Sequence, residues 1–170
     1  MNLQQTEDSK SQSTQLVSFS VGNESYGVNI SKVQEIIRMP EITQLPQTED
    51  YIKGNINLRG NIIPIIDMRT RFHMDTREYS EITRVIVLSI KDKLIGLIVD
   101  SVSKVLELDT AEVEEAPDII NGLSKEYIQG VGKVDENMII ILDTDKVLTA
   151  EEINLLKDVT KKSKNKKEIN

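Results

Sequence analysis

The sequence predicts an all-β protein of two packed five-stranded β-barrels followed by a short C-terminal helix. Ile and Val, which favour pleated sheets, supply 23 and 14 of the 170 residues. Short alternating apolar segments are interrupted by turn-forming residues along most of the chain. The segments also repeat, so the fold is expected to contain two similar units.

Eight strands are expected in four pairs, each joined by a polar turn. In chain order the pairs are Leu16–Val21 with Ser25–Ile30, Asn55–Arg59 with Asn61–Ile66, Arg84–Ile90 with Leu94–Val99, and Ile128–Val134 with Met138–Leu142. A further extended strand is expected after Val33 and another after Val102. Each unit then has about five strands, enough to close a small barrel and remove exposed sheet edges.

The repeat is seen by placing parts of the chain over one another. Tyr51–Asp67 placed over Tyr127–Asp143 is identical at 7 of 17 positions, without a gap. Val17–Ile37 placed over Ile86–Leu106 shares three identities and nearly the whole apolar pattern. The two members of the first pair of segments are farther apart along the chain than the two members of the second pair. This difference indicates one insertion in the second unit. We interpret this pattern as an old duplication.

The ends differ in composition from the middle. Residues 1–15 and the lysine-rich residues 160–170 are polar and are expected to be disordered. The domain is expected to span 16–159, with halves at roughly 16–80 and 81–148; exchange of strands between the halves remains open. A helix is expected at 149–159, because Thr149 can cap it and Glu152 follows three residues later.

Composition excludes several kinds of function. The chain has no cysteine and a single histidine, His73, so thiolate chemistry, a catalytic triad and a histidine-rich metal site are disfavoured. A net charge of −7 disfavours nucleic acid as a partner. No glycine pattern fits a phosphate-binding loop, and no apolar run approaches the roughly 18 residues that span a bilayer. We therefore expect a cytoplasmic protein with no enzymatic activity, no cofactor and no membrane insertion.

One charge pattern distinguishes the two units. Glu35 and Arg59 occupy positions where the second unit has Lys104 and Asp135, so both charges are exchanged. The pattern predicts an ion pair of opposite polarity in each unit. Coincidence of surface charges is the alternative. Asp67 and Asp143, which are also equivalent, are expected to cap turns or helices.

Several motifs together resemble the CheW-like domains of chemotaxis coupling proteins. They are Tyr26-Gly27-Val28, Lys32-Val33-Gln34-Glu35-Ile36, Asn57-Leu58-Arg59-Gly60, Ile63-Pro64-Ile65-Ile66-Asp67 and Gly96-Leu97-Ile98-Val99-Asp100. The resemblance covers about residues 16–159 and implies a fold of two five-stranded barrels with SH3-like topology.

The resemblance also implies a function and its residues. It implies an adaptor that binds the cytoplasmic tip of chemoreceptors and the regulatory domain of the histidine kinase CheA, in arrays where CheW-like domains also contact one another in rings. The implied receptor-binding residues are Val33, Glu35, Arg59 and Val102, and the implied kinase-binding residues are Glu114 and Ile119. The family often has a basic residue and an aromatic residue at the last two positions, which this chain lacks. A CheW-domain scaffold in a non-chemotaxis two-component pathway is the alternative.

Overall fold

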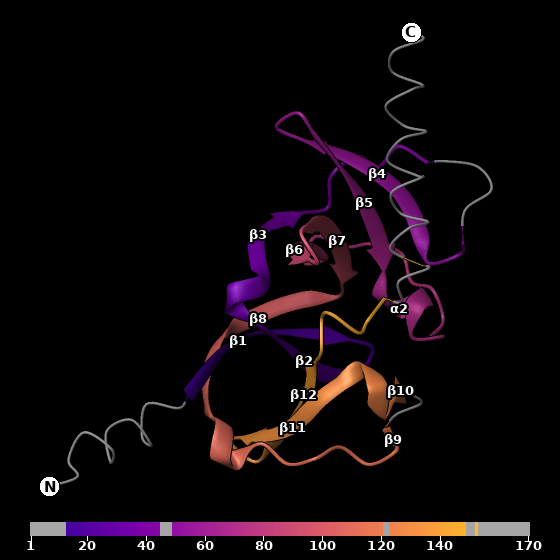
Figure 1. The fold of residues 1–170 in the computed structure, drawn as a ribbon. Coiled ribbons are helices and arrows are strands. Elements are labelled where there is room, and N and C mark those ends of the chain that lie inside the picture. The colour runs from indigo at the N-terminus through magenta and orange to yellow at the C-terminus, as the bar shows by residue number, and fades with distance from the viewer. Residues whose placement is uncertain (1–12, 45–48, 121–122, 149–151, 153–170) are drawn as a thin grey trace, which may run out of the picture.

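The computed structural model describes residues 13–44, 49–120, 123–148 and 152. It contains two five-stranded β-sheets, shown one above the other in Figure 1, so the predicted fold class is confirmed. The first sheet has the order β11-β12-β2-β1-β8: β1 (Ser13–Val21), β2 (Glu24–Asn29), β8 (Ser101–Asp109), β11 (Ile128–Val134) and β12 (Asn137–Leu142). The second has the order β3-β6-β7-β5-β4: β3 (Val33–Arg38), β4 (Ile52–Leu58), β5 (Asn61–Asp67), β6 (Arg84–Ile90) and β7 (Lys93–Val99). A small ribbon pairs β9 (Ile119–Ile120) with β10 (Leu123–Ser124).

The four predicted strand pairs are present as hairpins with two-residue turns. In the turn between β6 and β7, Lys91 and Asp92 both have positive φ values, 49° and 64°. This conformation gives a two-residue turn a twist that matches that of the strands. The first strand begins at Ser13, before the expected boundary of the domain at residue 16, because Ser13 pairs with Asp109 of β8.

Each sheet takes a hairpin from the other half of the repeat. The hairpin β1–β2 pairs with β8 on one side and in parallel with β12 on the other. The hairpin β6–β7 pairs in the same way with β3 and β5. The halves 16–80 and 81–148 therefore do not form separate sheets, and the strand exchange that the sequence left open occurs.

Buried side chains form one core between the sheets and a smaller core within each sheet. In β6, Ile86, Leu88 and Ile90 belong to a cluster that includes residues of both sheets. Val85 and Val87, on the opposite face of β6, pack in a second cluster within their own sheet. The corresponding cluster of the first sheet contains Leu16, Leu108, Ile139 and Ile141. Burial of apolar side chains therefore stabilises each sheet and also holds the two sheets together.

A backbone bridge links the two edges of each sheet. After β3, the N–H of Thr43 donates to the carbonyl of Asn55 in β4 (2.8 Å), and the N–H of Asn55 donates back (2.9 Å). Gly54 permits this approach, because it has a φ of 141° and a Cβ there would lie 2.1 Å from the Thr43 carbonyl oxygen. Glu114 and Val131 form the equivalent bridge in the first sheet. Both bridges are consistent with SH3-like barrels.

Helical segments in the described residues are short. They are α2 (Met68–Arg71) and the 3-10 turns η1 (Ile30–Lys32), η2 (Thr110–Glu112) and η3 (Lys125–Tyr127). The Asp67 carboxylate caps α2 by accepting from the N–H of Arg69 (2.9 Å), as predicted. The helix expected at 149–159 lies outside the described residues except for Glu152, as do the tail and most of the N-terminal arm. Within the described part of the chain, no helix combines the length and apolar character needed to cross a membrane.

Candidate functional site

The predicted ion pair between Glu35 and Arg59 is present. Arg59 Nη1 donates to Glu35 Oε1 (3.2 Å), and Nη2 donates to Oε2. The hydrogen bond and charge of Glu35 raise the pKa of Arg59. The arginine side chain is nevertheless 70% exposed, so the pair lies at the surface and is open to a partner.

The sequence had suggested that Arg59 ends a strand. In the structure it is part of a turn instead. Leu58 pairs with Asn61, so Arg59 and Gly60 form the turn between β4 and β5, with φ values of 51° and 88°. The side chain of Asn57 accepts a hydrogen bond from the N–H of Gly60 (2.9 Å) and stabilises the turn. The turn holds the guanidinium beside β3.

The second predicted ion pair is not formed. Lys104 and Asp135 line one hollow of about 230 Å³, so they lie near one another, but the described residues contain no ion pair between them. Ser18 and Ser25 also line this hollow, where the other half has the larger Val87 and Leu94. Lysine and aspartate together reach less far than arginine and glutamate, and both side chains here are exposed to water. Water can therefore solvate both charges without a direct contact.

Val33 and Val102 lie at equivalent places on the two sheets. Val33 of β3 pairs with Leu88, and Val102 of β8 pairs with Phe19. Directly paired residues point to the same face of a sheet, and Leu88 and Phe19 both belong to the core between the sheets. Both valines are half-buried against this core.

Two further apolar residues on these strands were missed by the sequence analysis. Ile36 pairs with Ile86 and is 39% exposed, while Val105 pairs with Val17 and is 52% exposed. They are equivalent in the repeat, so the alignment of the two units already matched them and could have identified them. We use the term apolar strip for the four residues Val33, Ile36, Val102 and Val105. Because β3 and β8 are edge strands, the apolar strip extends the inter-sheet core to the surface.

The two expected kinase-binding residues lie in another region. Glu114 is exposed and makes its backbone bridge to Val131. Ile119 begins β9, which Figure 1 shows on the side of the molecule away from β3. The surrounding acidic residues Glu112, Glu115 and Asp118 are exposed.

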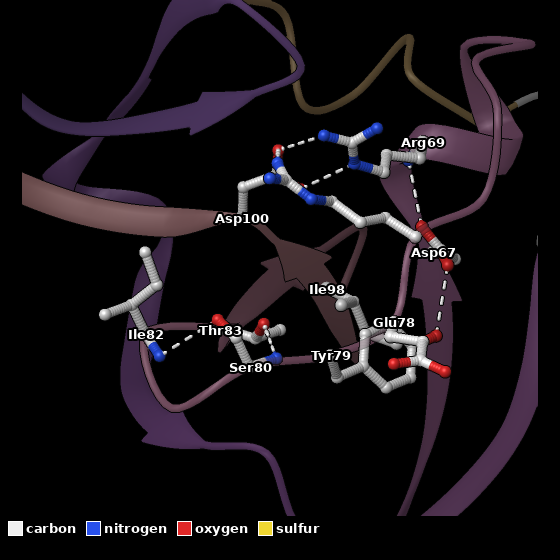
Figure 2. Close-up of a pocket in the computed structure, with 10 residues that line it drawn as sticks. Asp67, Arg69, Glu78, Tyr79, Ser80, Ile82, Thr83, Ile98 and Asp100 are labelled. Carbon is white, nitrogen blue, oxygen red and sulfur yellow. Dashed lines mark hydrogen bonds and ion pairs between the residues drawn. The ribbon is translucent and has the colours of Figure 1, made fainter.

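A small cavity of about 110 Å³ lies beside α2, and Figure 2 shows its polar side chains bonded to one another. Arg69 donates to both carboxylate oxygens of Asp100 (2.8 and 2.6 Å), and Tyr79 donates to Asp67 (3.0 Å). Asp100 also accepts from the N–H of Gly22, in the β1–β2 turn (2.9 Å). Burial alone would raise the pKa of Asp100, but the hydrogen bonds from Arg69 and Gly22 outweigh it and lower the pKa. This network ties the hairpin of one sheet to the other sheet.

The described ranges contain no cluster of metal-ligating side chains. In residues 13–44, 49–120 and 123–148, no three histidine, aspartate or glutamate side chains are placed together to hold an ion. His73 is exposed, as expected of an isolated histidine.

Comparison with known proteins identifies relatives along most of the chain. A family model described as CheW-like domain matches residues 15–152. The chain is 43% identical over 143 residues to a chemotaxis protein CheW of Klebsiella aerogenes, covering 84% of this chain and 86% of that protein. It is 34% identical over 146 residues to the CheW of Treponema pallidum, with the same coverage of 84% and 86%. The crystal structure of the scaffolding protein TtCheW from Thermoanaerobacter tengcongensis matches with a TM-score of 0.76 and 35% identity, covering 82% of this chain and 90% of that one.

Proposed function

This chain belongs to the family of CheW-like domains, and from that membership we propose that it is a non-enzymatic adaptor that couples chemoreceptors to the histidine kinase CheA. In this role it works in the cytoplasm and is recruited to receptor arrays at the membrane. The names of its relatives connect the family with chemotaxis and with scaffolding.

The apolar strip is the main observation that supports chemoreceptor binding. It places Ile36 and Val105, both substantially exposed, beside the half-buried Val33 and Val102. An amphipathic helix buries its apolar face in such a surface. The chemoreceptors that CheW-like proteins bind have a helical hairpin at their cytoplasmic tip, and this hairpin would supply that face.

The Glu35–Arg59 pair supplies the polar part of the same contact. Glu35 lies on β3 between two residues of the apolar strip, and Arg59 reaches it from the β4–β5 turn. Charges at the rim of an apolar contact set orientation and specificity more than affinity. We therefore assign Glu35 and Arg59 to the receptor-binding surface.

The kinase-binding surface is assigned to Glu114 and Ile119. Figure 1 shows β9, which contains Ile119, apart from β3, so kinase and receptor would bind different faces. The chain lacks the basic and aromatic residues common in the family there, so we expect a weakened contact with CheA and with neighbouring CheW-like domains in rings.

Reconstitution tests the proposal. Purified chain, CheA and chemoreceptor in vesicles are combined, and the rate of CheA autophosphorylation is measured with and without the chain. We expect receptor-dependent kinase activity to rise when the chain is added. ATP hydrolysis by the purified chain alone would contradict the adaptor role. Binding of a histidine kinase without any binding of chemoreceptor would instead favour a scaffold in a non-chemotaxis two-component pathway.

A further inference from the structure

A largely buried arginine lies where the two halves of the repeat meet. Arg71, in α2, has a side chain that is 11% exposed. Its guanidinium carbon lies 5.4 Å from the ring centre of Tyr51 and 5.2 Å from that of Tyr127. Both distances fall within the range at which a ring face attracts a cation, so Arg71 is held by two tyrosines.

These tyrosines are equivalent residues of the repeat, since each opens one of the two matching segments. Their carbonyls also make equivalent contacts: Tyr51 accepts from the N–H of Asp67 (2.8 Å) and Tyr127 from the N–H of Asp143 (3.0 Å). One guanidinium therefore connects corresponding points of both halves.

Arg71 binds the chain beyond β12 as well. Its Nη2 donates to the carbonyl of Val147 (3.0 Å) and to Glu152 Oε1 (3.2 Å). Burial, and then the hydrogen bond and charge of Glu152, raise the pKa of Tyr51, so this tyrosine stays neutral. The Glu152 carboxylate supplies the opposite charge that a buried guanidinium needs.

Arg71, Tyr51, Tyr127 and Glu152 together form what we call the cluster. The cluster and the apolar strip lie at opposite ends of the contact between the sheets. Figure 1 shows α2 on one side of the molecule and β3 and β8 on the other. The core between them is mostly aliphatic, and apolar contacts are non-directional. A directional contact at one end would restrain the angle between the sheets, and this angle would set the separation of β3 and β8 at the other end.

We propose that Arg71 is a positioning residue that fixes the spacing between β3 and β8. The consequence for receptor docking rests on the proposed function, but the spacing itself is a property of the free protein. A change at Arg71 would therefore alter the apolar strip without touching any of its residues.

Distance measurement between two spin labels tests this role. The chain has no cysteine, so nitroxides are attached through Gln34→Cys on β3 and Ser103→Cys on β8. Both positions are exposed, and they are equivalent in the repeat. Double electron–electron resonance on the full-length chain then reports the spacing directly.

The expected result differs between three arginine variants. Arg71→Met removes the charge and the donors and should broaden and shift the distance distribution. Arg71→Lys keeps the charge and should restore part of the narrow distribution. Arg38→Met is the matched control, because Arg38 is exposed and outside the cluster, and it should leave the distribution unchanged.

Circular dichroism establishes which variants fold. An unchanged distribution in folded Arg71→Met would overturn the proposal. Should Arg71→Met not fold, Tyr127→Leu removes one ring face from the cluster, and an unchanged distribution there would overturn it equally. Binding of a chemoreceptor fragment is measured on the unlabelled chains. A changed spacing with no binding by the unaltered chain would contradict the proposed function and support the positioning role.

Discussion

Arg59 combines an exposed ion pair with a constrained turn. Exposed ion pairs contribute little to stability, so we expect Arg59→Ala to leave the melting temperature nearly unchanged. Binding to a chemoreceptor fragment should fall several-fold, measured by isothermal titration calorimetry. Lys91→Ala, at an exposed turn residue with a similar φ, is the control. Equal binding by the Arg59 and Lys91 variants would contradict the assignment.

A second prediction concerns the valines of the apolar strip. Val33→Asp and Val102→Asp should each abolish chemoreceptor binding, because docking would bury a carboxylate without a partner. Both chains should remain folded by circular dichroism and should still bind CheA. Val105→Asp should act in the same way with less effect on folding, because Val105 is half exposed. Gln34→Asp, at an exposed neighbour on β3, is the control. Loss of both partners together would show that the valines serve the core.

Asp100 makes stability depend on pH. Its pKa is lower in the folded protein than the ordinary value of about 3.9. The stability it contributes is therefore complete above that value and is lost as the pH falls through the folded pKa. Asp100→Asn should lower the melting temperature near neutral pH and reduce the further loss below about pH 4, measured by differential scanning calorimetry. Asp92→Asn, in an exposed turn, should change neither.

At the scale of residues, the sequence predicted one ion pair correctly and one wrongly. Exchanged charges in a repeat show which positions are close, and the positions are close in both halves. Whether a pair forms depends on side-chain reach and solvation, which the repeat does not encode. The binding roles assigned to all six site residues stay predictions: Val33, Glu35, Arg59, Val102, Glu114 and Ile119.

At the scale of elements, Gly54 fixes how β4 meets the chain after β3. Gly54→Ala should destabilise the protein by about 1–3 kcal/mol from backbone strain, and further because its Cβ would meet the Thr43 carbonyl. Gly60→Ala is the matched control, since Gly60 also has a positive φ but no atom within 4 Å of the added Cβ. Thermal unfolding of both variants measures the difference. Equal losses would show that the close approach is unimportant.

The strands were predictable because alternation and turn residues are local signals. The four hairpins follow from them, and so does the cap at Asp67. The helix α2 was missed because four residues are too few for a periodic pattern. The hairpin exchange was left open for a different reason. A repeat shows which strands are equivalent, but not which hairpin completes which sheet.

At the scale of the whole molecule, the lysine-rich tail is predicted to be dispensable. Residues 160–170 are almost entirely polar and follow the last apolar stripe of the sequence. Deleting them should leave the melting temperature and chemoreceptor binding nearly unchanged, measured by calorimetry at physiological salt. A large loss of binding would assign the tail an electrostatic role.

The exchanged hairpins relate the two halves as if they were two chains that had swapped an identical element. One unit alone would present a hairpin without its sheet, and two identical units would satisfy each other by swapping hairpins as a homodimer. In such a dimer every surface would occur twice. The two halves of this single chain differ, so that Glu35 and Arg59 occur on one side only, with Lys104 and Asp135 at the matching place. The single chain therefore has one oriented face, which a symmetric dimer of identical units could not have.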